Sequence, residues 1–100
     1  MEKRAQFRLY RKKQRYKALV RDEFQCMVCR YLGLPKTAAT EVHHVYGRGN
    51  WKTRDIYEHY RMLISICRAH HHDYHFVRKT TDKQLMEKVL KYANERQRGW

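Results

Sequence analysis

The chain has few acidic residues, one proline and no long apolar run, and each shortage excludes a class of protein. Only 10 Asp and Glu stand against 23 Lys and Arg, so the formal net charge is +13 at pH 7. No apolar run approaches the roughly 18 residues of a membrane span, and no apolar segment follows the basic start as in a signal peptide. We therefore expect a soluble intracellular protein with no membrane association.

The charge imbalance indicates a polyanionic partner. One hundred residues form one domain with a modest core, and a mean hydropathy of -0.99 makes that core thin. The 13% of aromatic residues nevertheless argue against disorder. A strong positive excess repels itself in the compact state and attracts polyanions. Nucleic acid is the leading candidate, and an acidic membrane surface is the alternative.

The three cysteines cannot all pair as disulfides within the chain, and their spacing indicates a metal site. Cys26 and Cys29 form a CxxC pair, and Cys67 precedes His70 at the same two-residue gap. Two such pairs supply the four ligands of a tetrahedral Cys3His zinc site. A redox CxxC motif and ordinary buried thiols are the alternatives. We favour zinc because a thin core needs an additional constraint.

The sequence shows no repeats and no low-complexity segment, so we expect one α+β domain over residues 1–100. Its predicted parts are a basic helical extension (1–20), a metal-binding core (21–78) with strands at 40–46 and 62–66 and a helix at 68–77, and a C-terminal helix (80–97). Residues 50–61 are predicted to be irregular. Thr81 and Gln84 are a predicted capping box for the last helix.

The predicted N-terminal helix is rich in basic residues. Glu2 is the only acid in the first 21 residues, so the ion pairs that are typical of a solvated charged face are missing. We therefore expect this helix to contact phosphates. The candidate DNA contacts are Arg4, Arg8, Arg11, Lys12 and Arg15.

The histidines divide by their spacing. His71 and His75 are four residues apart and share one helical face, while His70 lies about 100 degrees round the axis and can face the zinc. His43 and His44 are neighbours on a strand, so their rings point to opposite faces. One of these two could join His71 and His75 in a three-imidazole metal site. The other is then free to act as a general base.

Together these motifs resemble the HNH endonuclease family over about residues 21–76. The shared order is CxxC, then HH before a Gly-rich turn, then an apolar strand that ends in CxxHH with a histidine four residues later. The resemblance implies a ββα-metal fold, in which a strand–strand–helix unit holds one divalent cation and a separate structural zinc braces the unit, as in phage-encoded members. It also implies hydrolysis of DNA, with double-stranded DNA as the partner and either nicking or double-strand cleavage as the outcome, in the cytoplasm of a bacterial or phage-infected cell.

The resemblance assigns roles to single residues. His44 matches the general base, His43 the metal ligand before it, and His71 and His75 the helix ligands. Three imidazoles suit Mn2+, Ni2+, Co2+ or Zn2+ better than Mg2+. Arg48, on the turn beside the base, is a candidate phosphate contact. The residues that match the zinc ligands are Cys26, Cys29, Cys67 and His70.

The sequence departs from the family where an asparagine positions the base histidine. That place is held by Met62, which has no hydrogen-bond donor. We expect His59, Asn50 or a backbone carbonyl to orient the base instead, and otherwise catalysis is impaired. The alternative functions are a non-catalytic zinc-binding nucleic-acid module, and a structural or interaction protein.

Overall fold

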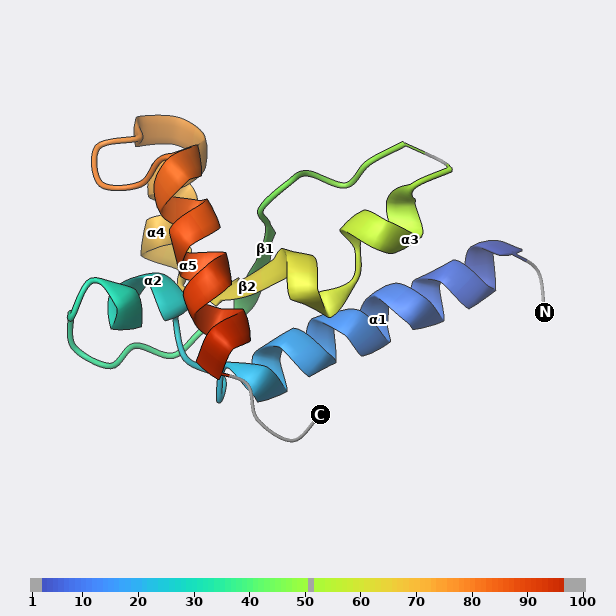
Figure 1. Cartoon of the computed structure of the whole chain (residues 1–100), viewed down its shortest axis with the longest axis horizontal. Coiled ribbons are helices and arrows are strands. Elements are labelled where there is room, and N and C mark those ends of the chain that lie inside the picture. Colours follow the sequence, from blue (N-terminus) through green and yellow to red (C-terminus); the bar gives the residue numbers. More distant parts are fainter. Residues whose placement is uncertain (1–2, 51, 97–100) are drawn as a thin grey trace.

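The computed structural model describes residues 3–50 and 52–96 and has the α+β character expected (Figure 1). Helices surround one two-stranded antiparallel sheet. The last residue of the helix predicted over 80–97 lies outside the described residues. In chain order the elements are α1 (Lys3–Arg21), α2 (Met27–Tyr31), β1 (Glu41–His44), α3 (Arg54–Tyr57), η1 (Tyr60–Met62), β2 (Leu63–Ile66), α4 (Arg68–His72), η2 (Asp73–Val77) and α5 (Lys83–Arg96).

The sheet separates two hydrophobic clusters. His43 lies opposite Ile64 and His44 lies opposite Leu63 in the antiparallel register. Because side chains alternate along a strand, the face that holds Ile64 packs with α2 and α5, whereas the face that holds Leu63 packs with α1. The two strands are each shorter than predicted, and Met62 belongs to η1 rather than to β2.

A buried ion pair at the end of α1 connects the helices to the sheet. The side chains of Arg21 and Asp22 are both fully buried, and Arg21 donates to both carboxylate oxygens of Asp22, at 2.7 and 2.8 Å. The same guanidinium donates to the carbonyl of Leu63 at 2.6 Å and to the side chain of Asn94 in α5 at 2.9 Å. Asp22 in turn accepts the backbone N–H of Ser65 in β2 at 3.0 Å. These contacts fix α1 and α5 on β2.

The segment predicted to be irregular, 50–61, is partly helical, which corrects that prediction. It forms α3 and η1, and α3 lies beside the N-terminal half of α1 (Figure 1). The Tyr10 hydroxyl donates to the carbonyl of Asp55 at 2.7 Å, and the Arg54 guanidinium lies 3.7 Å from the centre of the Phe7 ring. Tertiary contacts with α1 therefore stabilise a helix that four residues could not form alone.

The capping box predicted at Thr81 and Gln84 is wrong. The side chain of Asp82 accepts the backbone N–H of Leu85 at 2.8 Å and so caps α5. The Thr81 hydroxyl donates instead to the Asp73 carboxylate at 2.6 Å, which joins the start of α5 to η2. Hydrogen bonds from this hydroxyl and from the Thr80 and Thr81 backbone lower the pKa of Asp73 to about 2.

The helix predicted over 68–77 starts as α4 and ends as a π-helical turn, η2, where the N–H of Arg78 reaches the carbonyl of Asp73. π-helical turns of this kind are frequent at functional sites.

Within the described ranges, no helix has both the length and the apolar character that crossing a membrane requires.

Candidate functional site

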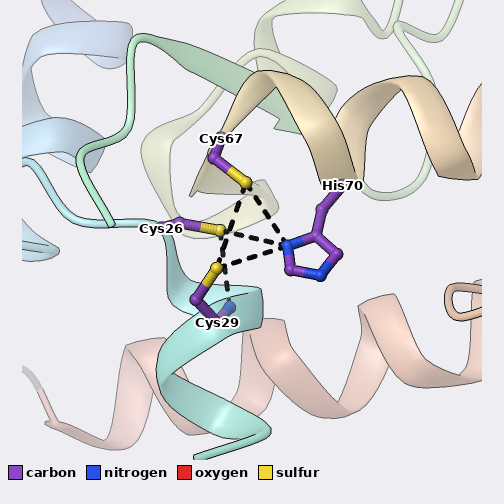
Figure 2. A group of neighbouring side chains, drawn as sticks. All are labelled: Cys26, Cys29, Cys67 and His70. Carbon is purple, nitrogen blue, oxygen red and sulfur yellow. Dashed lines mark hydrogen bonds between the residues drawn. The ribbon is translucent and has the colours of Figure 1, made fainter. Parts of the chain in front are cut away.

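Three cysteines and one histidine converge on the sheet face that packs with α2 and α5. Cys26 immediately precedes α2 and Cys29 lies in its first turn, while Cys67 immediately precedes α4 and His70 lies on that helix. Figure 2 shows the three sulfurs turned toward one another and toward Nδ1 of His70. Three of the four side chains belong to buried residues, and His70 is half-buried. The two predicted pairs therefore form one cluster that could hold a metal ion such as zinc.

The spacing within this cluster fits a tetrahedral zinc ion. His70 Nδ1 lies 3.8, 3.4 and 3.3 Å from the sulfurs of Cys26, Cys29 and Cys67, and the sulfurs of Cys29 and Cys67 are 4.0 Å apart. Around a tetrahedral zinc ion with bonds of ordinary length, a ligand nitrogen and a ligand sulfur lie about 3.6 Å apart, and two ligand sulfurs lie about 3.8 Å apart. Burial raises the pKa of the Cys26 thiol to about 12. Because a bound metal deprotonates its thiol ligands, binding at this cluster would release protons.

A second cluster, of three imidazoles, lies on the α4 side of β1. Its members are His43 on β1, His71 on α4 and His75 on η2, and their candidate ligand atoms all lie within 4.8 Å of one another. The Nε2 atoms of His71 and His75 are 3.1 Å apart. The ring of Tyr74 packs edge-on against His43 at 4.6 Å between centroids. The strand and the helical spacing thus bring together the three predicted ligands.

The buried member of this cluster has an unpaired nitrogen. Nε2 of His43 is buried and has no hydrogen-bond partner among the described residues. Burial, with smaller contributions from the nearby His71 and His75, lowers the pKa of His43 to about 4, and burial also lowers the pKa of His75. These two imidazoles are therefore neutral near pH 7, which is the form that binds metals. A buried nitrogen without a partner is costly in a native protein, and a metal ion would satisfy it.

Glu41 orients one imidazole of the cluster and was not among the predicted site residues. Its carboxylate lies 2.5 Å from Nδ1 of His71, so Nε2 of that ring is left to face His75. Carboxylates commonly fix metal-binding histidines in this way. The hydrogen bond to His71 is the main cause of the lowered pKa of Glu41. Strand alternation was the available signal, because Glu41 and His43 are two residues apart and share a face.

His44 lies on the other face of β1 and contacts a buried carboxylate. Its Nε2 is 2.8 Å from Glu58, whose side chain is only 3% exposed. Burial lowers the pKa of His44, while Glu58 acts in the opposite direction. The prediction that His59 or Asn50 orients His44 is wrong, because the side chain that contacts His44 is Glu58. His59 accepts the N–H of Arg61 at 3.2 Å, and the Asn50 side chain accepts N–H groups of its own loop.

Both histidines of β1 reach one pocket of about 270 Å³ at the end of the strand. Gly47 and Arg48 of the Gly-Arg-Gly turn line this pocket, and exposed Arg48 lies close enough to lower the pKa of His44. The positive φ of 78° at Gly47 is of the kind that favours glycine at this turn. The pocket is lined by Val42, His43, His44, Gly47, Arg48, His71 and His75.

Most of the predicted DNA contacts gather in one hollow on α1. Four of the five predicted DNA contacts line a surface hollow of about 520 Å³, together with Tyr16 and Leu19. Arg15 is near enough to Glu41 to help lower its pKa, and Nε of Arg11 is 3.6 Å from Glu58. Arg11 therefore belongs to the basic hollow on α1 and also pairs with Glu58, which contacts His44. The four residues of the hollow are Arg8, Arg11, Lys12 and Arg15, and the fifth, Arg4, is exposed nearer the start of α1.

Comparisons with protein-family models, with curated proteins and with solved structures found no match to this chain.

Proposed function

We propose that the protein is a metal-dependent DNA endonuclease of the HNH type. One observation carries the proposal: a single pocket is lined by a three-imidazole cluster, by a carboxylate-bound histidine from the opposite strand face, and by an arginine. A cation site, a base and a phosphate-binding group are the three components that hydrolysis of a phosphodiester needs. The antiparallel β1–β2 pair followed by α4 has the order of the ββα-metal unit.

The proposed division of work follows from the two strand faces. His43, His71 and His75 would hold a divalent cation, which when bound would stabilise negative charge on the phosphate and on the leaving oxygen. His44 takes a proton from the attacking water as a general base. Arg48 holds a phosphate oxygen at the mouth of the pocket. All-nitrogen ligands favour Mn2+, Ni2+, Co2+ or Zn2+ over Mg2+.

DNA is the proposed substrate because of the charge and its distribution. The net charge of +13 suits a polyanion, and Arg11 connects the basic hollow on α1 to the site, because it pairs with Glu58, which contacts His44 of the pocket. A duplex that follows α1 would bring a phosphate to Arg48. The Cys26, Cys29, Cys67 and His70 cluster is proposed to hold structural zinc.

A non-catalytic zinc-binding nucleic-acid module is the alternative, and Met62 favours it. Met62 stands where the family has the asparagine that positions the base, and its carbonyl accepts the N–H of Val45 at 3.2 Å. Glu58 weakens this alternative, because a buried carboxylate already contacts His44. A module that only bound DNA would need neither the three-imidazole cluster nor this contact.

A plasmid-nicking assay with a panel of divalent metals tests the proposal. His44→Ala should keep both metal sites and lower the cleavage rate by about 10²–10⁴-fold, the usual contribution of a general base. His43→Ala should weaken binding of the catalytic metal, so raised metal concentration should recover part of its activity. His72→Ala is the matched control, because His72 is exposed and packs on Phe76 at 4.9 Å between ring centroids.

Three outcomes would count against the proposal. Wild-type protein that binds duplex DNA but does not nick it with any metal would favour the non-catalytic module. Wild-type activity in both His43→Ala and His44→Ala would remove the pocket from the reaction. Metal rescue of His44→Ala but not of His43→Ala would show that the two roles are reversed.

A further inference from the structure

Glu58 is a buried acid that directly follows a short helix with exposed residues. Its side chain is 3% exposed, whereas Asp55 and Ile56 of the preceding helix are exposed. One oxygen lies 2.8 Å from Nε2 of His44, and the other lies 3.6 Å from Nε of Arg11. A carboxylate is buried at considerable cost unless it is paired. Glu58 is paired with a histidine of the proposed site on one side and with α1 on the other.

The contact with an ionised Glu58 would favour one tautomer of His44. An ionised carboxylate can only accept hydrogen bonds, so Nε2 must hold the hydrogen that points at Glu58. In the neutral ring the lone pair then belongs to Nδ1. The same contact fixes the rotation of the ring about its side-chain bonds. A base that works through Nδ1 therefore requires that Glu58 keep its place.

We propose that Glu58 is a positioning residue for His44, holding the tautomer whose Nδ1 can accept a proton, and that Arg11 holds the Glu58 carboxylate in place. The inference rests on the proposed nuclease function, in which His44 is the base. Glu58 would do the work that the family assigns to the asparagine replaced here by Met62. Because Arg11 lies on α1, the helix proposed to contact DNA also supports the base.

A double-mutant cycle on the cleavage rate separates positioning from a merely structural ion pair. Glu58→Ala should lower kcat by about 10–100-fold, the range found for residues that orient metal-binding histidines, with little change in KM. His44→Ala should cost about 10²–10⁴-fold. If Glu58 acts through His44, the double variant should match His44→Ala within about two-fold. Independent effects would instead multiply to about 10³–10⁶-fold.

Two further variants test whether the tautomer of His44 is the cause of the loss. Glu58→Gln should lose activity almost as Glu58→Ala does. With Arg11 facing the amide oxygen, the amide nitrogen donates to His44 and selects the tautomer with hydrogen on Nδ1. Asp55→Asn is the matched control, because it removes an acid from the exposed face of the neighbouring helix and should retain wild-type kcat.

Nitrogen NMR of the histidine rings provides a readout that does not depend on cleavage. Wild-type protein should show the hydrogen of His44 on Nε2, and Glu58→Gln should move it to Nδ1. A wild-type ring with its hydrogen on Nδ1 would overturn the proposal whether or not the protein cuts DNA. Multiplying effects in the cycle would overturn it too, while leaving the nuclease function intact. The expected NMR result in a protein that cuts no DNA would refute the nuclease function and, with it, the catalytic part of this proposal.

Discussion

Replacing Arg21 by methionine should be among the most destabilising single changes in the fold. The substitution removes both hydrogen bonds to Asp22 and those to the carbonyls of Leu63 and Tyr60, in a place where the side chain is fully buried. The Asp22 carboxylate, equally buried, keeps the single N–H of Ser65. Breaking a buried pair from one side costs about 3–5 kcal/mol because a charge is left uncompensated. That loss is a large part of the roughly 5–15 kcal/mol that stabilises a domain.

A second substitution tests whether the uncompensated charge is the cause. Arg21→Met combined with Asp22→Asn removes both charges, while the amide oxygen can still accept the N–H of Ser65. The double variant should therefore be more stable than Arg21→Met alone, as for other buried pairs replaced by neutral residues. Arg30→Met is the control, because its partner Glu23 is 3.9 Å away and well exposed, and such surface pairs contribute about 0–1 kcal/mol.

Urea unfolding followed by far-UV circular dichroism, at fixed zinc and salt, measures all four proteins. Two results would refute the reasoning. A loss for Arg21→Met no larger than that for Arg30→Met would mean that the buried pair does not stabilise the junction of α1, β2 and α5. A double variant as unstable as Arg21→Met would mean that the loss of stability comes from the lost contacts of Arg21 and not from the unpaired charge of Asp22.

Three other predictions concern the metal sites and α1. Cys29→Ala should leave the chain largely unfolded, since structural zinc contributes on the order of 10–16 kcal/mol in zinc-finger peptides; a cooperative thermal transition near that of the wild type would contradict this. Glu41→Ala should weaken metal binding at the three-imidazole cluster by about 10–100-fold, measured by calorimetry on zinc-loaded protein, and unchanged affinity would show that the contact with His71 is incidental. Arg8→Gln with Lys12→Gln should reduce the slope of log affinity for duplex DNA against log salt by about 1.8, and an unchanged slope would remove this face of α1 from the interface.

The parts of the site that could be predicted depend on local geometry. Three spacing rules do not depend on tertiary structure. They are the two-residue gap within each ligand pair (Cys26 with Cys29, Cys67 with His70), the four-residue spacing of His71 and His75 on a helix, and the alternation of side chains along a strand. These rules brought together both ligand clusters found among the described residues. They also separated the rings of the two strand histidines, one toward α4 and the other toward Glu58.

The residues that could not be predicted depend on where distant segments pack. Glu58 lies in a polar stretch that looks solvated until α3 and η1 fold against α1, where Tyr60 donates its N–H to Gln14 at 2.8 Å. Arg21 and Asp22 are both charged, and no spacing rule indicates that they pack inside, yet both are buried. Thr81 matched a capping motif but is bonded to Asp73, eight residues earlier. Spacing carries no information about such partners.

The relative position of His43 and His44 depends on both faces of a very small sheet. Two strands of four residues each are marginally stable by themselves, so packing on both sides must hold β1 in register with β2. On one face this packing includes Cys26, Cys29 and Cys67. On the other face α1 packs against Leu63, and the buried pair at its end binds the backbone of β2. Because one histidine belongs to each face, a loss at either support would separate the proposed base from the proposed cation site even where the remaining helices stay folded.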